Sequence, residues 1–262
     1  MKGETSPPPA SRQAATVIVF RNGPEGEPPE ILMTIRSQEM VFAGGMAVFP
    51  GGTIDDADFN LARAVTVSAG IEVEEAAHRI GAIRETLEET GLAIGITGQI
   101  DALSAQNARS MLLEKGDFAP VLEKFGWSLD LQQLTPFARW LPSLGGPKRV
   151  YDTRFYLANL GTGDVKIAAD LSENTHLFWT SAKGALGAAN KGEIKIIFPT
   201  RRNLERLAQF NNFAETRAHA EAIPIRKISP QVDKSGDHPI LRIPEDAGYP
   251  VTSELLESVL RG

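Results

Sequence analysis

Short apolar runs, each bounded by glycine, proline or charged residues, mark the first fifth of the chain. ATVIVF (15–20) and EILMTIR (30–36) are rich in β-branched and aliphatic residues, and the loop GPEGEPPE lies between them. This arrangement predicts two strands that form a hairpin. A third apolar segment, MAVFPGG (46–52), ends in Pro-Gly-Gly, which is a strong stop signal.

Helical spacing replaces this pattern from about Val73 to Thr90. Ala76, Ile80, Ile83 and Leu87 fall on one face of such a helix, and Gly91 suits its C-terminal end. Residues 101–125 also have an amphipathic helical pattern. Farther along we expect a helix in SAKGALGAANKG, with Ser181 as its N-cap, and strands in 137–142, 153–160, 164–169 and 175–179.

Strands in the middle of the chain, with helices on either side of them, favour a layered α/β or α+β domain. The proline-rich residues 1–13 predict a disordered tail, and 14–195 form the expected main domain. From Ile196 onward the chain predicts two short helices or one long bent helix, then a late strand and turn. We therefore expect 196–262 to be a C-terminal helical extension that packs on the same domain.

Composition narrows the function. The 262 residues carry a net charge of −6, which argues against a nucleic-acid partner because no basic excess exists. There is no cysteine, so a disulfide scaffold, a zinc–thiolate site and a cysteine nucleophile are excluded. No stretch approaches the roughly 20 apolar residues that span a bilayer. We expect a cytoplasmic protein without a membrane partner, either a monomer or a homodimer.

The stretch RETLEETG (84–91) concentrates negative charge at the end of the predicted helix. Glu85, Glu88 and Glu89 centre on the face opposite the apolar one, and Arg84 lies four residues before Glu88. Like charges at this spacing, in the last turn of a helix, oppose helix formation. Either the acids are a solvated surface, or they hold a hard cation such as Mg²⁺ or Mn²⁺, which prefers oxygen ligands.

RETLEETGL (84–92) resembles the second half of the Nudix box, Arg-Glu-U-x-Glu-Glu-x-Gly-U, where U is aliphatic. Every fixed position matches, which chance would give in fewer than about one such chain in ten thousand. The first half of the box is present in altered form, since Gly52 is followed after five residues by Asp58 instead of glutamate. The 25 residues 59–83 then exceed the usual spacing by 18, so a strict pattern search would miss this box.

An interrupted box resembles the branch of Nudix hydrolases that includes peroxisomal coenzyme A diphosphatases. TIRSQEMVFAGGMAVFPGG (34–52) is similar to the segment that precedes the box in coenzyme A-cleaving members, although Val41 and Ala43 replace its arginine and histidine. The resemblance implies a Nudix-type α/β/α sandwich with a mixed central sheet. It also implies hydrolysis of the pyrophosphate linkage in a small nucleotide substrate, with coenzyme A or acyl-coenzyme A first.

Two alternatives stay open for the function. The first is a pyrophosphatase that acts on NADH, ADP-ribose or a similar dinucleotide. The second is a Nudix-fold module that binds a nucleotide without cleaving it, because the insertion could occlude the site.

The resemblance also assigns roles to residues. It makes Glu85, Glu89 and Glu88, with the carbonyl of Gly52, the ligands of Mg²⁺ or Mn²⁺, and it makes Arg84 the residue that orients these carboxylates. The glycines of FPGG allow the loop to approach the cation closely. Asp58 either braces Arg84 or caps a helix that opens the insertion.

The remaining candidates rest on position and residue type. Glu173 is a candidate general base, because many relatives carry a late glutamate there. Arg36, Arg149 and Gly51 are expected to contact the substrate, since glycine-flanked basic residues suit phosphate. His78 is expected to face solvent, and Trp140 is expected to belong to the core.

Overall fold

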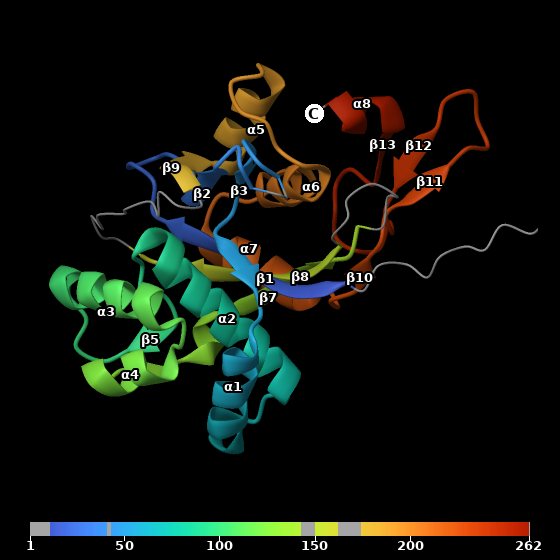
Figure 1. The fold of residues 1–262 in the computed structure, drawn as a ribbon. Coiled ribbons are helices and arrows are strands. Elements are labelled where there is room, and N and C mark those ends of the chain that lie inside the picture. The colour runs from blue at the N-terminus through green and yellow to red at the C-terminus, as the bar shows by residue number, and fades with distance from the viewer. Residues whose placement is uncertain (1–10, 41–42, 143–149, 162–173, 262) are drawn as a thin grey trace, which may run out of the picture.

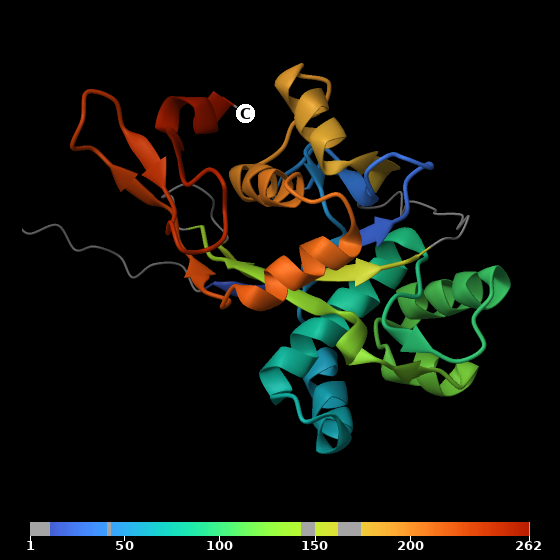
Figure 2. The same ribbon diagram turned by 180° about the vertical axis from the view of Figure 1, so that it is seen from behind.

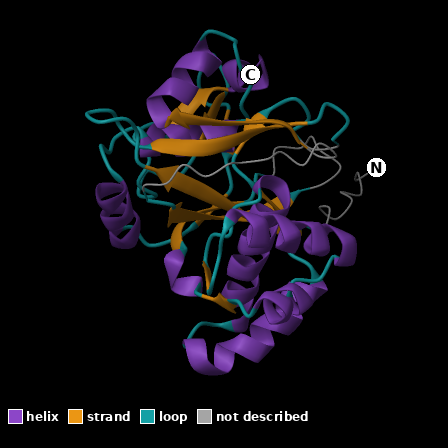
Figure 3. Ribbon diagram, turned by 90° about the vertical axis from the view of Figure 1, so that its left-hand side faces the viewer, coloured by secondary structure: helices purple, strands orange, loops and turns teal. Residues whose placement is uncertain are grey.

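The structure is a computed structural model, and it describes residues 11–40, 43–142, 150–161 and 174–261. Figure 1 shows the chain as a layered α/β fold, with a central sheet and helices on both of its faces. Figure 3 shows the same layers from the side, with the strands between two groups of helices. The expected α/β class is confirmed.

The central sheet is mixed. β1 (Arg12–Arg21) runs parallel to β8 (Tyr151–Asn159) and antiparallel to β2 (Glu30–Arg36). The strand order is β10-β7-β8-β1-β2-β3, with β4 also paired to β1 and β9 also paired to β2. The bounds of the other strands are β3 Ala47–Val48, β4 Gly51–Thr53, β7 Thr135–Trp140, β9 Asn174–Ser181 and β10 Lys227–Ile228.

β1 changes its antiparallel partner along its length. Its first half pairs with β4, where Ala15 lies opposite Gly52 and Thr16 opposite Gly51. Its last two residues, Phe20 and Arg21, pair with β2 instead, as the predicted hairpin requires. The segment that connects β3 to β4 therefore crosses from one pairing to the other at Pro50, whose carbonyl accepts the N–H of Val17 at 3.0 Å.

Each face of the sheet buries its own apolar cluster. Ala15, Val17 and Val19 of β1 pack toward α1 (Asp56–Ala69), α2 (Val73–Thr90), α3 (Ala102–Lys115) and α4 (Ala119–Phe125). Ile18 and Phe20 point the other way, toward α5 (Ala182–Asn190), α6 (Phe198–Leu207) and α7 (Phe213–Ala222). Figure 2 shows α7 lying across this second face. The alternation follows from the period of two in a strand.

The predicted helix 73–90 is confirmed at both ends. Gly91 adopts a left-handed conformation at φ 77°, and its N–H donates to the carbonyl of Leu87. The helical pattern of residues 101–125 corresponds to two helices, because Gly116 ends α3 at φ 65°. The N-cap at Ser181 is confirmed by its acceptance of the Gly184 N–H. The strand predicted at 164–169 lies outside the described residues.

The insertion forms helix α1 and the beginning of α2. Ala62 of α1 is fully buried in the cluster on this face. Gly81 of α2 provides the space for α1, because a Cβ at this position would lie 2.6 Å from Cδ1 of Ile54 and 3.0 Å from Oδ2 of Asp58. α1 is thus an integral part of the layer that carries α2.

The C-terminal segment contributes more than helices. α6 and α7 are separate, and β10 adds a strand to the edge of the central sheet by parallel pairing with β7. β11 (Gln231–Asp233), β12 (Ile240–Arg242) and β13 (Ser253–Leu255) form a second small sheet, followed by α8 (Leu256–Arg261). Of these strands the sequence pattern indicated β12 alone. β5 (Ile96–Thr97) and β6 (Ser128–Leu129) pair separately, and η1 (Leu131–Gln133) follows β6.

One sequence expectation is wrong at the start of the main domain. Arg12 and Gln13, expected in the tail, pair with Tyr151 and Asp152 as the start of β1. Among the described residues no helix combines the length and the apolar character that crossing a bilayer requires.

A buried polar chain ties the C-terminal segment to the sheet. The hydroxyl of Tyr249 accepts the indole N–H of Trp140 at 2.9 Å and donates to Oδ1 of Asn203 on α6 at 2.7 Å. The Tyr249 and Trp140 rings also meet edge to face, with centroids 5.6 Å apart. Trp140 is 1% exposed, so it belongs to the core as expected.

Replacing Tyr249 with phenylalanine tests this chain. The Tyr249→Phe variant leaves a buried indole donor and a buried amide oxygen unpaired, so we expect the free energy of unfolding to fall by about 1–3 kcal/mol. Denaturant unfolding measures it. In a Trp140→Phe background the same change should cost less, because the indole donor is already absent. Equal costs in both backgrounds would contradict the hydrogen-bonded chain.

Candidate active site

Arg84 lies buried at the centre of the acidic helix end. Its Nε and Nη2 each donate to one oxygen of Asp58 at 3.0 Å, and Nη2 also donates to the carbonyl of Thr53 at 2.9 Å. The same Asp58 accepts the N–H of Asp55 in the first turn of α1 at 2.9 Å. Asp58 therefore braces Arg84 as considered, and it also completes the capping box of α1, although the N-cap itself is Asp55.

The third nitrogen of this guanidinium, Nη1, donates hydrogen bonds to two of the glutamates. Nη1 donates to Oε1 of Glu85 at 2.9 Å and to Oε2 of Glu88 at 3.1 Å. Burial by itself would lower the pKa of Arg84, but the hydrogen bonds to Asp58 and the charges of Glu85, Asp58 and Glu88 raise it above its ordinary value. Arg84 is therefore a permanent cation, and the expected contact with Glu88 is confirmed.

Glu89 binds the loop that precedes α1. Its Oε2 accepts the backbone N–H of Gly51 at 2.9 Å, and the residue is 3% exposed. The face of α2 opposite the apolar one is therefore not a solvated surface at this end. Strand β4 lies along it, as the contact between Gly51 and Glu89 requires.

The two glycines of β4 make this approach sterically feasible. A Cβ on Gly52 would lie 2.4–2.5 Å from the carboxyl atoms of Glu85, and a Cβ on Gly51 would lie 2.3 Å from the carbonyl oxygen of Ala15. Gly51 also has φ 150°, which residues with a side chain rarely adopt. Glycine at both positions brings the backbone into direct contact with the carboxylates.

Because the carboxyl groups are buried, their ionised form costs free energy. Burial, together with the negative charges of Glu88 and Glu89, raises the pKa of Glu85 to about 8, against the lowering effect of Arg84. Burial also raises the pKa of Glu88. A helix C-terminus adds to this cost, because its dipole disfavours anions.

A cavity of about 590 Å³ lies beside these residues. Its walls come from both faces of the sheet. Glu85, Glu88, Glu89, Arg84 and both glycines of β4 contribute on the α2 side. The other lining residues include Arg36, Met40 and Val48 near β2, Leu112 and Leu113 of α3 with Gly116 at its end, Phe49 between β3 and β4, Phe155 of β8, and Ile197, Pro199 and Thr200 at the start of α6.

The donor set suits a hard divalent cation, although the side chains are engaged with protein groups. Within the described part of the chain, no three His, Asp or Glu side chains form a ready metal-binding group. Glu85 and Glu88 face Arg84, and Glu89 faces the Gly51 N–H. Each carboxylate can accept more hydrogen bonds or a metal ion, because it offers about four lone-pair sites. Oxygen ligands of this kind match the preference of Mg²⁺ and Mn²⁺.

Of the other candidate residues, one lies among the described residues and two lie outside them. Arg36 lines the cavity, and its Nε has no hydrogen-bond partner in the structure as described. Arg149 and Glu173 lie outside the described residues, so their roles stay predictions.

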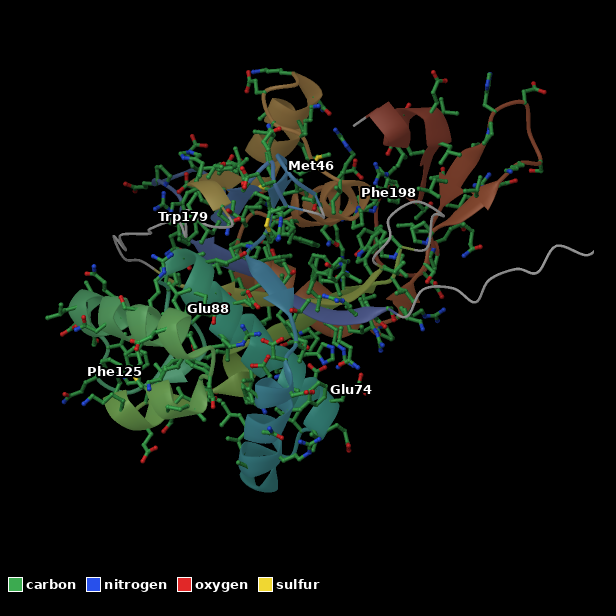
Figure 4. The ribbon with its side chains drawn as sticks, viewed as in Figure 1. Met46, Glu74, Glu88, Phe125, Trp179 and Phe198 are labelled. Carbon is green, nitrogen blue, oxygen red and sulfur yellow. The ribbon has the colours of Figure 1, made fainter. Side chains whose placement is uncertain are left out.

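The expectation that His78 faces solvent is wrong. His78 is 2% exposed, and its Nδ1 lies 2.7 Å from the carbonyl oxygen of Glu74. Arg154 of β8 reaches the same turn and pairs with Glu74 and Glu75, so this part of α2 is covered by the protein. Burial lowers the pKa of His78. Figure 4 labels Glu74 and Glu88, which lie toward opposite ends of α2.

Sequence reasoning missed the parts of the cavity that come from α3 and α6. Leu113 is 51% exposed, although its neighbour Leu112 is fully buried. The sequence shows two adjacent leucines and does not say which of them faces the cavity, so it carried no signal for this wall. The start of α6 carried no such signal, because Pro199 and Thr200 resemble an ordinary helix N-terminus.

Removing the main carboxylate partner of Arg84 should be costly. In Asp58→Ala the guanidinium stays buried without the two oxygens that it binds, so we expect the free energy of unfolding to fall by about 3–5 kcal/mol. Asp56→Ala, on the exposed side of the same helical turn, is the control and should cost less than about 1 kcal/mol. Similar losses in the two variants, measured by urea unfolding, would contradict the central role of this ion pair.

Comparison with known proteins gives relatives in sequence and in fold. No family model matches the chain. Its sequence is 26% identical to the acyl-coenzyme A diphosphatase NUDT19 of Gallus gallus, over 77% of this chain and 69% of that protein. Its fold is similar to that of a NUDIX hydrolase from Alicyclobacillus acidocaldarius, with a TM-score of 0.68 and 25% identity over 80% of this chain and 96% of the other. In the box, in fold and in sequence the chain is therefore similar to Nudix hydrolases, and its sequence resembles an acyl-coenzyme A diphosphatase.

Proposed function

We propose that this protein hydrolyses the pyrophosphate linkage of a nucleoside-diphosphate-linked substrate and that the reaction depends on Mg²⁺ or Mn²⁺. One observation carries the proposal. Glu85, Glu88 and Glu89 are gathered around Arg84 and against the backbone of Gly51 and Gly52, and the same residues line a cavity of about 590 Å³.

Glu85, Glu88 and Glu89, with the carbonyl oxygen of Gly52, would hold the divalent cation. Two observations support this set of ligands. All of its donor atoms are oxygens, as Mg²⁺ prefers, and Gly52 closely approaches the carboxylate of Glu85. A bound cation would neutralise the pyrophosphate charge and activate the attacking water. The chain itself supplies the placement of the carboxylates and a site shielded from bulk water.

Arg84 acts on the carboxylates in this proposal and does not act on the substrate. Among the described residues, its hydrogen bonds and ion pairs go to Asp58, Asp55, Glu85, Glu88 and the carbonyl of Thr53. Its positive charge offsets the repulsion among the glutamates before any cation binds. A guanidinium suits this task, because it presents five donors in a fixed fork and keeps its charge.

Coenzyme A or an acyl-coenzyme A is the first substrate that we propose. Support comes from the likeness of segment 34–52 to the motif of coenzyme A-cleaving enzymes and from the likeness to the diphosphatase of Gallus gallus. The cavity is large enough to hold much more than a pyrophosphate group, and many of its walls are apolar. Arg36 and Gly51 on its wall are the proposed substrate contacts, together with Arg149.

The general base is proposed to be Glu173, on the strength of its place in the sequence. Two alternative functions remain to be separated by experiment. A dinucleotide pyrophosphatase would prefer NADH or ADP-ribose over coenzyme A, and a non-catalytic module would bind one of these without turnover.

A substrate panel tests the proposed function. We expect coenzyme A or an acyl-coenzyme A to be cleaved in the presence of Mg²⁺ or Mn²⁺, with mass spectrometry of the products locating the broken bond. Glu89→Gln should lower kcat/KM by about a hundredfold or more, because it removes a proposed ligand. Glu74→Gln, on the same helix but away from the carboxylates, is the control and should retain activity. A wild-type protein that cleaves no member of the panel, which includes NADH and ADP-ribose, would overturn the proposal.

Arg36 is expected to act on substrate binding. Its guanidinium lines the cavity with an unpaired Nε, so Arg36→Ala should raise KM about tenfold while kcat changes little. Arg21→Ala is the matched control, since Arg21 pairs with Glu30 on the neighbouring strand and does not line the cavity. A KM equal to that of the control would show that Arg36 does not contact the substrate.

A further inference from the structure

The last turn of α2 needs outside donors for its backbone. The final carbonyls of a helix have no intrahelical N–H partners, and here they belong to the turn that carries Glu88 and Glu89. The N–H of Gly91 donates to the carbonyl of Leu87 at 2.9 Å. Arg109 of α3 supplies the next two donors. Its Nε donates to the carbonyl of Glu88 at 2.8 Å, and its Nη2 donates to the carbonyl of Glu89 at 3.4 Å.

The positive charge of Arg109 lies at a helix end that carries excess negative charge. The C-terminal end of a helix carries partial negative charge, and three glutamates lie in or beside this turn. α2 has no basic residue of its own in its last turn. Arg84 offsets the carboxylate side chains, whereas Arg109 offsets the backbone carbonyls of the same residues. The two guanidiniums therefore act on different atoms of one helical turn.

α3 also forms part of the cavity wall. One turn after Arg109, Leu112 and Leu113 line the cavity, and Gly116 at the end of the helix does the same. Ala108 and Leu112 are fully buried in the apolar cluster between α3 and its neighbours, so α3 has a fixed place against the layer. Figure 1 shows α3 beside α2. One helix thus carries both the contact to the acidic turn and a wall of the site.

We propose that Arg109 is a positioning residue for the carboxylates of Glu88 and Glu89. It fixes the backbone of the last turn of α2, and so it keeps Glu89 within reach of the Gly51 N–H and Glu88 within reach of Arg84. Its effect on metal binding and hydrolysis rests on the proposed function, whereas its effect on the order of the helix end does not. The two parallel donors that it presents to adjacent carbonyls explain why arginine suits this position.

The experiment compares Arg109→Gln and Arg109→Lys with wild type. In Arg109→Gln we expect the amides of the last turn, around Leu87 to Gly91, to exchange hydrogen about tenfold faster, because the turn opens more readily once the carbonyls of Glu88 and Glu89 lose their Arg109 donors. We also expect Mn²⁺, titrated alone, to bind about 10–100-fold more weakly, as is typical when a supporting residue is lost. For the hydrolysed substrate kcat should fall and KM should stay within about threefold of the wild-type value. Arg109→Lys should recover part of the exchange protection and of the Mn²⁺ affinity, because it keeps the charge and one donor.

Arg217→Gln is the matched control. Arg217 is an exposed residue of α7 that pairs with Glu221 on the same helix, so all three measurements should equal those of wild type. Unchanged exchange and unchanged Mn²⁺ affinity in Arg109→Gln, even with a lower melting temperature, would overturn the proposal and leave Arg109 a purely stabilising residue. If Arg109→Gln fails to fold, the same two measurements on Arg109→Lys decide. If wild type binds no Mn²⁺ and cleaves nothing, the proposed function fails, and the exchange data still decide whether Arg109 orders the turn.

Discussion

The buried guanidinium of Arg84 is the interaction on which the rest of the site depends. It binds a carboxylate from α1, two carboxylates from α2 and the backbone of β4 at once. These contacts join three elements that are separated in the sequence by the insertion. Without this cation, Asp58, Glu85 and Glu88 would repel one another in a place that solvent cannot screen. The protein therefore accepts a buried charge so that several like charges can lie together.

The central sheet provides the geometry for this arrangement. β1 pairs with β4 in its first half and with β2 in its second half, so β4 is directed away from β2 and toward the acidic turn of α2. Gly51 and Gly52 allow the last few ångströms of approach, which a Cβ at either position would prevent. Residues of β1 and β4 line the cavity at this divergence, and its other walls come from α3 on one face and from α6 on the other.

The insertion and the C-terminal segment turn out to support this arrangement. α1 delivers Asp58 to Arg84, so the residues that interrupt the box also supply its bracing acid. The C-terminal segment contributes a strand to the sheet and, through the Tyr249 hydroxyl, joins Trp140 of β7 to Asn203 of α6. The carboxylates of α2 are therefore supported by α1, and the sheet beside them is extended by the C-terminal segment.

The sequence by itself determined the local features. Helix 73–90, its glycine end, the first hairpin and the pairing of Arg84 with Glu88 follow from side-chain periodicity and spacing, which act over a few residues. The box identified the acids, because their order along one helix is a local property. Tertiary structure alone decided which surfaces were covered. His78 is buried because Arg154 of β8 reaches across its turn, and Glu89 is buried because β4 lies along it. Such contacts join residues dozens of positions apart, and no periodicity in the chain records them. The walls of the cavity at Leu113 and Pro199, and the contact of Arg109 with the end of α2, depend in the same way on how helices pack, so they became visible only in the folded protein.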